Sequence, residues 1–127
     1  MAHELRQWPR NVYPGEVLTD FPEAQADVDV ALRELRTQGP RPDGYQFKTL
    51  GAAKAGLWQL NFKSSKGKQI RILYAPYDRV IVVFRIHKKS SPQEQQRAYA
   101  LAMKRKREAE QIIKTSGMGH VGTLAVH

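Results

Sequence analysis

The chain has 127 residues, a formal net charge of +9 and no cysteine, which excludes disulfides and thiolate metal sites and suits one modest core. No apolar run approaches the ~20 residues that cross a bilayer, and Met1 to Arg10 lack the apolar stretch of a signal peptide. We therefore expect a cytoplasmic protein with no membrane association.

The first clear element is a helix at residues 22–38. Before it, Leu5 to Trp8 can form a short edge strand, and Pro14-Gly15 marks a turn. Pro22 suits the first helical turn, and Gly39-Pro40 ends the helix. Apolar residues recur at helical spacing and predict a stripe that faces the core: Phe21, Ala24, Val28, Ala31, Leu32 and Leu35. Residues 41–44 are a loop, and residues 45–56 are a Gly/Ala-rich approach to the next elements.

Three strands follow at residues 57–63, 69–75 and 79–87, with turns at 64–67 and 76–78. Apolar and polar side chains alternate along them, so a period of two predicts one apolar and one polar face. In the third strand we expect Val80, Val82, Phe84 and Ile86 on one face, and Ile81, Val83, Arg85 and His87 on the other. The predicted polar face of the sheet consists of Gln59, Asn61, Lys63, Gln69, Arg71, Arg85 and His87.

A second helix is predicted from about Pro92 to Lys114. Ser91 and Glu94 form a capping box, with proline at the first helical position. One side of this helix is expected to carry Ala98, Leu101, Ala102, Arg105, Ala109 and Ile112. Residues 115–127, with three glycines, are expected to form a flexible tail.

These elements predict an α+β fold. A small antiparallel sheet, a three-stranded meander plus a possible N-terminal edge strand, would be flanked by helices within one domain at residues 1–114. The second sheet face would stay open and cationic.

The positive charge is concentrated in one part of the chain. Residues 1–62 hold 7 Lys/Arg against 8 Asp/Glu, whereas residues 63–114 hold 14 Lys/Arg against 4 Asp/Glu. Such asymmetry favours a polyanionic partner, because neutralised phosphates release counterions. We therefore expect nucleic acid, most of all RNA, ahead of a merely cationic surface or an anionic membrane.

The residues of the basic part allow RNA chemistry without a metal or a cofactor. Phosphate loops, metal-binding histidine pairs and Ser or Cys nucleophile motifs are missing, but RNA carries its own nucleophile, the 2′-hydroxyl. Arg71 could stabilise the phosphorane or simply form a salt bridge. His87 could act as a neutral base, its pKa lowered by Lys88 and Lys89, or be a solvated residue at the strand end. Tyr99 could move a proton or simply pack.

The other cations are candidates for contacts to the RNA backbone, although a run of charges on a helix is most often solvated. These candidates are Lys63, Lys66, Lys68, Arg85, Lys88, Lys104, Arg105, Lys106 and Arg107.

Several segments together resemble a known family. They are Phe21-Pro22-Glu23, Leu57 to Leu60, Ile70 to Tyr74, Val80 to Lys89, and Ser91 to Ala98. In order and spacing, the stretch from Phe21 to about Arg107 resembles the RelE/HigB family of bacterial toxin–antitoxin toxins, above all the phage-derived HigB-type subgroup.

This resemblance implies a RelE-like fold and a metal-independent mRNA endonuclease that acts in the ribosomal A site. It also implies a cognate antitoxin that covers the active surface. Arg71 matches the arginine that contacts the scissile phosphate, Lys89 the basic residue after the last strand, and Tyr99 loosely the aromatic acid or base. Gln59 and Asn61 stand where RelE has lysines, and we infer that His87 serves as the base.

The leading hypothesis is a toxin that cleaves mRNA on the ribosome and thereby inhibits translation. Two alternatives are a non-catalytic basic module that binds nucleic acid or an antitoxin, and a gyrase poison like the related ParE proteins.

Overall fold

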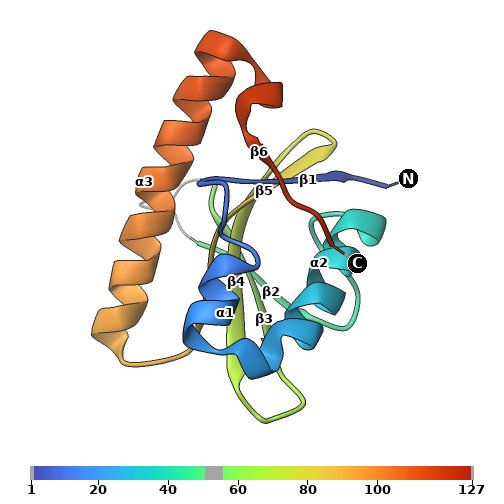
Figure 1. Cartoon of the computed structure of the whole chain (residues 1–127), viewed down its shortest axis with the longest axis vertical. Helices are drawn as coiled ribbons and strands as arrows, with labels where there is room; N and C mark the ends of the chain where they lie inside the picture. Colours follow the sequence, from blue (N-terminus) through green and yellow to red (C-terminus); the bar gives the residue numbers. More distant parts are fainter. Residues whose placement is uncertain (1, 51–55, 127) are drawn as a thin grey trace.

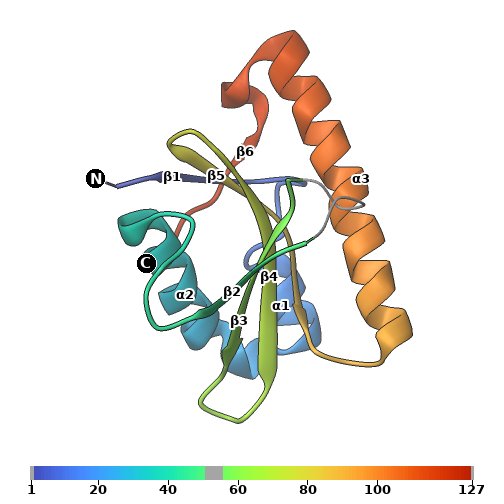
Figure 2. The same ribbon diagram turned by 180° about the vertical axis from the view of Figure 1, so that it is seen from behind.

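Six strands form one mixed sheet in the computed structural model, which describes residues 2–50 and 56–126. The strands are β1 (Glu4–Gln7), β2 (Gln46–Thr49), β3 (Trp58–Lys63), β4 (Gln69–Tyr77), β5 (Val80–Lys88) and β6 (Gly122–Thr123). The α-helices are α1 (Gly15–Asp20), α2 (Gln25–Gln38) and α3 (Pro92–Ser116), with 3-10 turns η1 (Pro22–Ala24) and η3 (Met118–His120). Helix α3 covers one side of the sheet, and α1 and α2 lie on the other (Figure 1; Figure 2). The predicted α+β class is confirmed.

The predicted meander is confirmed as the centre of the sheet, where β3, β4 and β5 pair antiparallel. The turn predicted at 76–78 is displaced, because β4 continues through Tyr77, which pairs with Val80. Asp78 makes the turn at a φ of 57°, a left-handed conformation that aspartate tolerates. Pro76 does not end the strand.

The N-terminal strand forms as expected but does not lie at the edge. The sheet order is β2-β3-β4-β5-β1-β6, so β1 lies parallel to β5 and is flanked by β6. At the opposite edge, β2 pairs with β3. This strand falls in the expected approach at 45–56, of which residues 51–55 lie outside the described residues.

A β-bulge in β5 changes which side chains share a face. Tyr74 pairs with Val83 but Leu73 pairs with Arg85, which leaves Phe84 as the extra residue. Beyond this bulge the alternation changes phase, so Ile86 joins Ile81 and Val83 on the face of α1 and α2. Arg85 and His87 lie on the opposite face, beside Leu73 and Arg71, and not with Ile81 and Val83 as predicted. Simple alternation misassigned Ile86 because a bulge consumes one residue.

Both faces of the sheet are packed, and the prediction of one open face is therefore wrong. Toward α1 and α2, the sheet contributes Leu60, Ile70, Ile72, Tyr74, Ile81, Val83 and Ile86 to the larger core. Toward α3 lies a second apolar cluster that includes Leu73, Ala75, Val82, Phe84, Ala98 and Ala102. Small alanines let α3 approach the sheet closely, and beyond Leu73 this face carries polar side chains, among them those of Asn61, Arg71 and His87.

The two predicted helices are confirmed. The first consists of η1 and α2, with Pro22 in the first turn and Gly39 at the C-cap. The second is α3, in which the Ser91 side chain accepts a hydrogen bond from the Glu94 N–H at 3.2 Å. It runs two residues further than predicted and ends at Gly117, whose φ is 93°. No helix in the described ranges is long and apolar enough to cross a bilayer.

The C-terminal segment is not the flexible tail that was expected. After η3, β6 pairs with β1, and the Leu124 N–H donates to the Leu5 carbonyl at 3.2 Å. Val121 and Leu124 are buried. The two buried side chains and the pairing of β6 with β1 therefore fix this segment against the sheet, although it has no Lys, Arg, Asp or Glu and little regular secondary structure.

Candidate functional site

A polar row crosses the three central strands at the end of the face that α3 covers. Asn61 on β3 pairs with Arg71 on β4, and Arg71 pairs with His87 on β5. Directly paired residues of adjacent strands point to the same side of a sheet. The row therefore brings Arg71 and His87 together on one face, as predicted, although the bulge in β5 and not simple alternation puts His87 there.

His87 is almost fully buried, with 6% of its surface exposed. This burial lowers the pKa of the imidazole to about 4, with the positive charges of Arg85 and Arg71 acting in the same direction and a hydrogen bond to the Lys88 backbone opposing them. The pKa of His87 is therefore lowered, as predicted, but the causes are burial and two arginines and not Lys88 and Lys89. His87 is neutral at pH 7.

Arg71 and His87 each keep a buried nitrogen without a partner. Arg71 Nη1 and His87 Nε2 have no hydrogen-bond partner among the described residues, and the same holds for Arg85 Nε. Buried polar atoms are nearly always satisfied, so two such atoms on neighbouring strands indicate a place for a ligand.

Two cavities flank the polar row. The first, which we call the edge cleft, has a volume of about 660 Å³ and lies at the free edge of β3; Arg71, Asn61, Lys63, Gln69 and Lys89 are among its lining residues. The second, the helix cleft, has a volume of about 370 Å³ and lies between the end of β5 and the start of α3. Its lining includes Arg85, His87, Lys88, Glu94 and Arg97.

Tyr99 lies in a chain of hydrogen bonds under α3. Gln95 Nε2 donates to the Tyr99 hydroxyl at 2.7 Å, Tyr99 donates to Gln59 Oε1 at 2.7 Å, and Gln59 Nε2 donates to Asn61 Oδ1 at 2.8 Å. Tyr99 is 5% and Gln59 1% exposed. The hydroxyl is thus placed to hold Asn61 beside Arg71, and not in either cleft.

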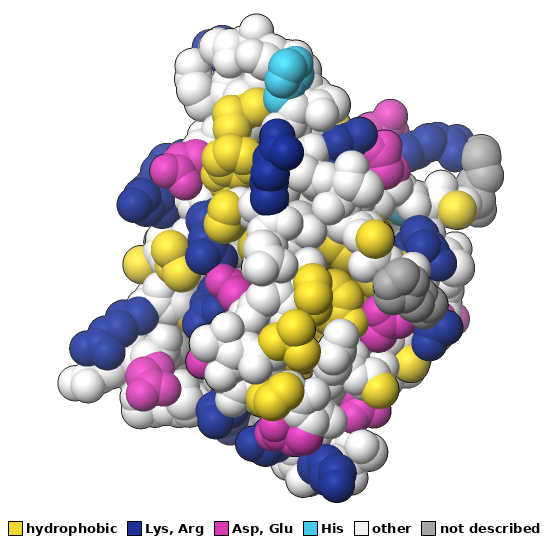
Figure 3. Space-filling model, viewed as in Figure 1, with side chains coloured by type: hydrophobic (Ala, Val, Ile, Leu, Met, Phe, Trp, Pro, Cys, Tyr) yellow, Lys and Arg dark blue, Asp and Glu magenta, His cyan; other side chains and the backbone are white. Residues whose placement is uncertain are grey.

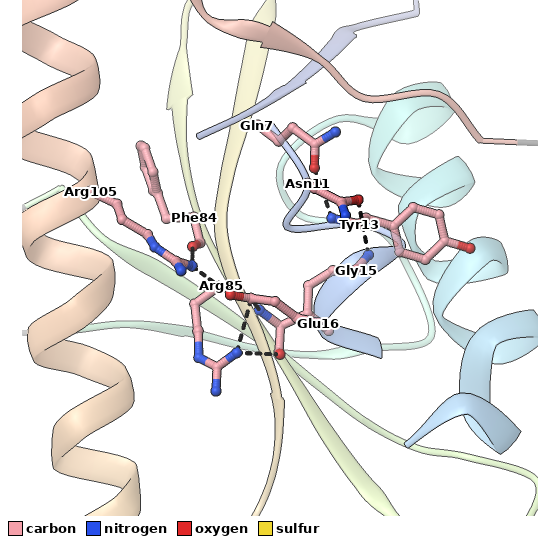
Figure 4. A network of polar contacts seen from close by, with 9 residues as sticks. Gln7, Asn11, Tyr13, Gly15, Glu16, Phe84, Arg85 and Arg105 are labelled. Carbon is pink, nitrogen blue, oxygen red and sulfur yellow. Dashed lines mark hydrogen bonds and ion pairs between the residues drawn. The ribbon is translucent and has the colours of Figure 1, made fainter. Parts of the chain in front are cut away.

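Glu16 on α1 joins three elements behind the row (Figure 4). Its Oε1 lies 3.0 Å from Arg85 Nη1 and accepts the Ile86 N–H at 3.0 Å, while its Oε2 accepts from Arg105 Nη1 at 2.7 Å. Arg105 Nη1 also donates to the Phe84 carbonyl at 2.6 Å. Arg85 and Arg105, both predicted to contact RNA, are therefore engaged in fixing the bulge to α1 and α3.

The loop before α1 positions Glu16. The buried Gln7 side chain accepts the Tyr13 N–H at 2.7 Å, and Asn11 Oδ1 accepts the Gly15 N–H at 3.2 Å (Figure 4). Sequence reasoning missed Glu16. A lone acid in a short, weakly periodic segment carries no signal of a partner about 70 residues away.

The other predicted backbone-binding cations divide into two groups. Lys68 pairs with Glu23, and Lys106 is buried and pairs with Glu110 at 2.6 Å. The exposed ones are Lys63, Lys66, Lys88, Lys104 and Arg107, and Lys89, predicted as a catalytic residue, is exposed as well. On the face seen in Figure 3, Lys and Arg side chains are interspersed with acids and do not form one basic patch. No cluster of three His, Asp or Glu side chains able to hold a metal occurs in the described part of the chain.

A known family matches this chain. The model of a family described as phage-derived protein Gp49-like (DUF891) matches residues 16–107, well over half of the chain. The matched range begins at Glu16 and includes Arg71, His87, Lys89 and Tyr99. The comparisons with curated proteins and with solved structures found no match.

Proposed function

The chain belongs to the phage-derived Gp49-like family, and on this premise we propose that it is a HigB-type toxin of a toxin–antitoxin pair, an endoribonuclease that cleaves mRNA on the ribosome. The observation that carries the proposal is the pair of buried, unpartnered nitrogens on Arg71 and His87. A cation that has no counter-charge among the described residues, with a neutral imidazole beside it, supplies what internal cleavage of an RNA phosphodiester requires.

The proposed reaction uses the 2′-hydroxyl of the substrate. Its oxygen bonds to the adjacent phosphorus while His87 Nε2 accepts the proton, and the bond from phosphorus to the 5′ oxygen breaks. The Arg71 guanidinium stabilises the charge that develops on the phosphorane oxygens. The products are a 2′,3′-cyclic phosphate and a 5′-hydroxyl, which receives its proton from the Lys89 ammonium.

The other polar groups act through these three. Tyr99 is a positioning residue in this proposal, because its hydroxyl contacts Gln59 and Gln95 and has no place beside the phosphate. Glu16 positions His87 by fixing Arg85 and the Ile86 backbone two and one residues before it. Lys63, Lys66 and Lys88 are left to attract the RNA backbone.

A cognate antitoxin follows from the same charge argument. The exposed lysines of the β3–β4 turn and of the end of β5 form the basic surface that a cell producing this toxin would have to block with a binding partner. Opposite charge accelerates such an association. We propose an acidic antitoxin that covers the edge cleft and Lys89, encoded beside this gene.

The proposal is tested by inducing the wild-type chain in bacteria and mapping new mRNA 5′ ends. Cleavage ends should appear with growth arrest. Arg71→Ala should lower the cleavage rate about 10²- to 10³-fold, whereas Lys114→Ala, which removes a charge at the far end of α3, should leave it unchanged.

Three outcomes contradict the proposal. Translation that stops while messages stay intact indicates a non-catalytic binding module. DNA damage without loss of translation indicates a gyrase poison. Full cleavage by Arg71→Ala removes the residue on which the mechanism rests.

A further inference from the structure

We infer that the edge cleft is a subsite for one nucleobase of single-stranded RNA, with Tyr45 as the stacking surface. The inference rests on the proposed function and adds to it the way in which the substrate strand is held. The base would lie toward the α2 side of the sheet, and the scissile phosphate toward the α3 side.

The cleft exists because β2 is short. Strand β2 begins at Gln46, which pairs with Asn61. Phe62 and Lys63 therefore extend beyond β2, and on their other side they pair with β4. The hollow beside them is open to both faces of the sheet, so Arg71 from the α3 side and Val30 from the α2 side both line it.

The lining combines rings with amides, which is the chemistry that receives a base. Tyr45 and Phe62 are partly exposed, and their rings meet edge to face with centroids 5.6 Å apart. Bases stack on such rings in proteins that bind single strands. The side-chain amides of Gln46, Asn61 and Gln69 also line the cleft and can pair with the polar edge of a base.

Charge orients a nucleotide in this cleft. Arg71, Lys63 and Lys89 line it on the side of the polar row, while Asp27 of α2 lies on the other side. Asp27 Oδ2 accepts from the Ser65 N–H and hydroxyl, both at 3.1 Å, which fixes the carboxylate there. The phosphate therefore belongs beside Arg71, and the uncharged base belongs beside Tyr45.

The test is a titration with two uncleavable tetranucleotides that carry 2′-O-methyl sugars, one with all its bases and one with a single abasic position. Wild-type protein should bind the complete strand about 5- to 150-fold more tightly, the range expected for one stacked base. Tyr45→Leu should lose this preference and Tyr45→Phe should keep it. Phe47→Leu is the matched control, because the Phe47 ring packs on Trp58 (4.8 Å) and under Arg41 (4.7 Å), outside the cleft.

Equal affinity of wild-type protein for the two strands, or no binding of either, overturns the inference. So does a loss of preference in Phe47→Leu as large as that in Tyr45→Leu. The result is independent of cleavage: a base preference that depends on Tyr45 in a protein that leaves messages intact keeps the subsite and rejects the nuclease. Conversely, if wild type and Tyr45→Leu cut messages equally, and each binds the complete and the abasic strand with equal affinity, the nuclease is kept and the subsite is rejected.

Discussion

Acid should destabilise this protein through His87 in particular. The folded state holds the pKa of His87 at about 4, because the side chain is buried among positive charges, whereas the unfolded chain has an ordinary value near 6.5. Below pH 6.5 the unfolded chain therefore takes up a proton that the folded chain refuses. Stability is lost as the pH falls from about 6.5 toward 4.

The size of the effect follows from the two values. One pKa unit corresponds to about 1.4 kcal/mol, so the full difference is worth about 3 kcal/mol. Linkage places about 2 kcal/mol of it between pH 7 and pH 5. Glutamine at position 87 does not titrate, so between pH 7 and pH 5 the free energy of unfolding of His87→Gln should fall by about 2 kcal/mol less than that of the wild type.

The assay is urea unfolding of both proteins at pH 7 and pH 5, with the free energy extrapolated to water. The double difference isolates His87, because the other titrating groups are common to both proteins. If wild type and His87→Gln lose the same stability on acidification, His87 is not held neutral by burial, and its proposed role as a base at neutral pH is refuted.

Three further predictions concern the framework of the site. Glu16→Gln should lower the free energy of unfolding in urea by about 3 kcal/mol, because two part-buried arginines lose their counter-charge. The control Glu4→Gln, in an exposed ion pair, should lower it by less than about 1 kcal/mol. Equal losses in the two variants would show that Glu16 has no special structural role. Tyr99→Phe removes the donor to buried Gln59 and should cost about 1–3 kcal/mol; cleavage lost as fully as in Arg71→Ala would instead make the hydroxyl a catalytic group. Deletion of residues 118–127 should cost roughly 3–6 kcal/mol for two buried side chains, and an unchanged melting temperature would contradict the packing of β6.

The fold was predictable where a pattern was long and regular. Alternation over six to nine residues identified β3, β4 and β5, and helical spacing with caps identified α2 and α3. The edge elements were not predictable in this way. Strand β6 has two residues, β2 has four, and both depend on a partner strand supplied by another part of the chain.

The site was predictable only in part. The prediction that Arg71 and His87 share a face is correct, but the bulge at Phe84 brings this about, because strict alternation would keep His87 on the face of Val83. Alternation could not reveal that α3 covers this face, since the burial of Gln59 and Tyr99 arises from tertiary packing. Nor could it assign Arg85, because the ion pair with Glu16 depends on the bulge at Phe84 and on a helix far away in the sequence.

The position of β1 between β5 and β6 links assembly of the site to the order in which the chain is synthesised. Glu4 pairs with Val80, and Gln7 pairs with both Val83 and Gly122. Strand β1 therefore stays unpaired until β5 follows roughly 75 residues later, a separation of the kind that slows folding. Helix α3, which encloses His87, comes later still. A nascent chain that does not yet include α3 consequently lacks the enclosure of His87, and with it the assembled form of the phosphate site that we propose.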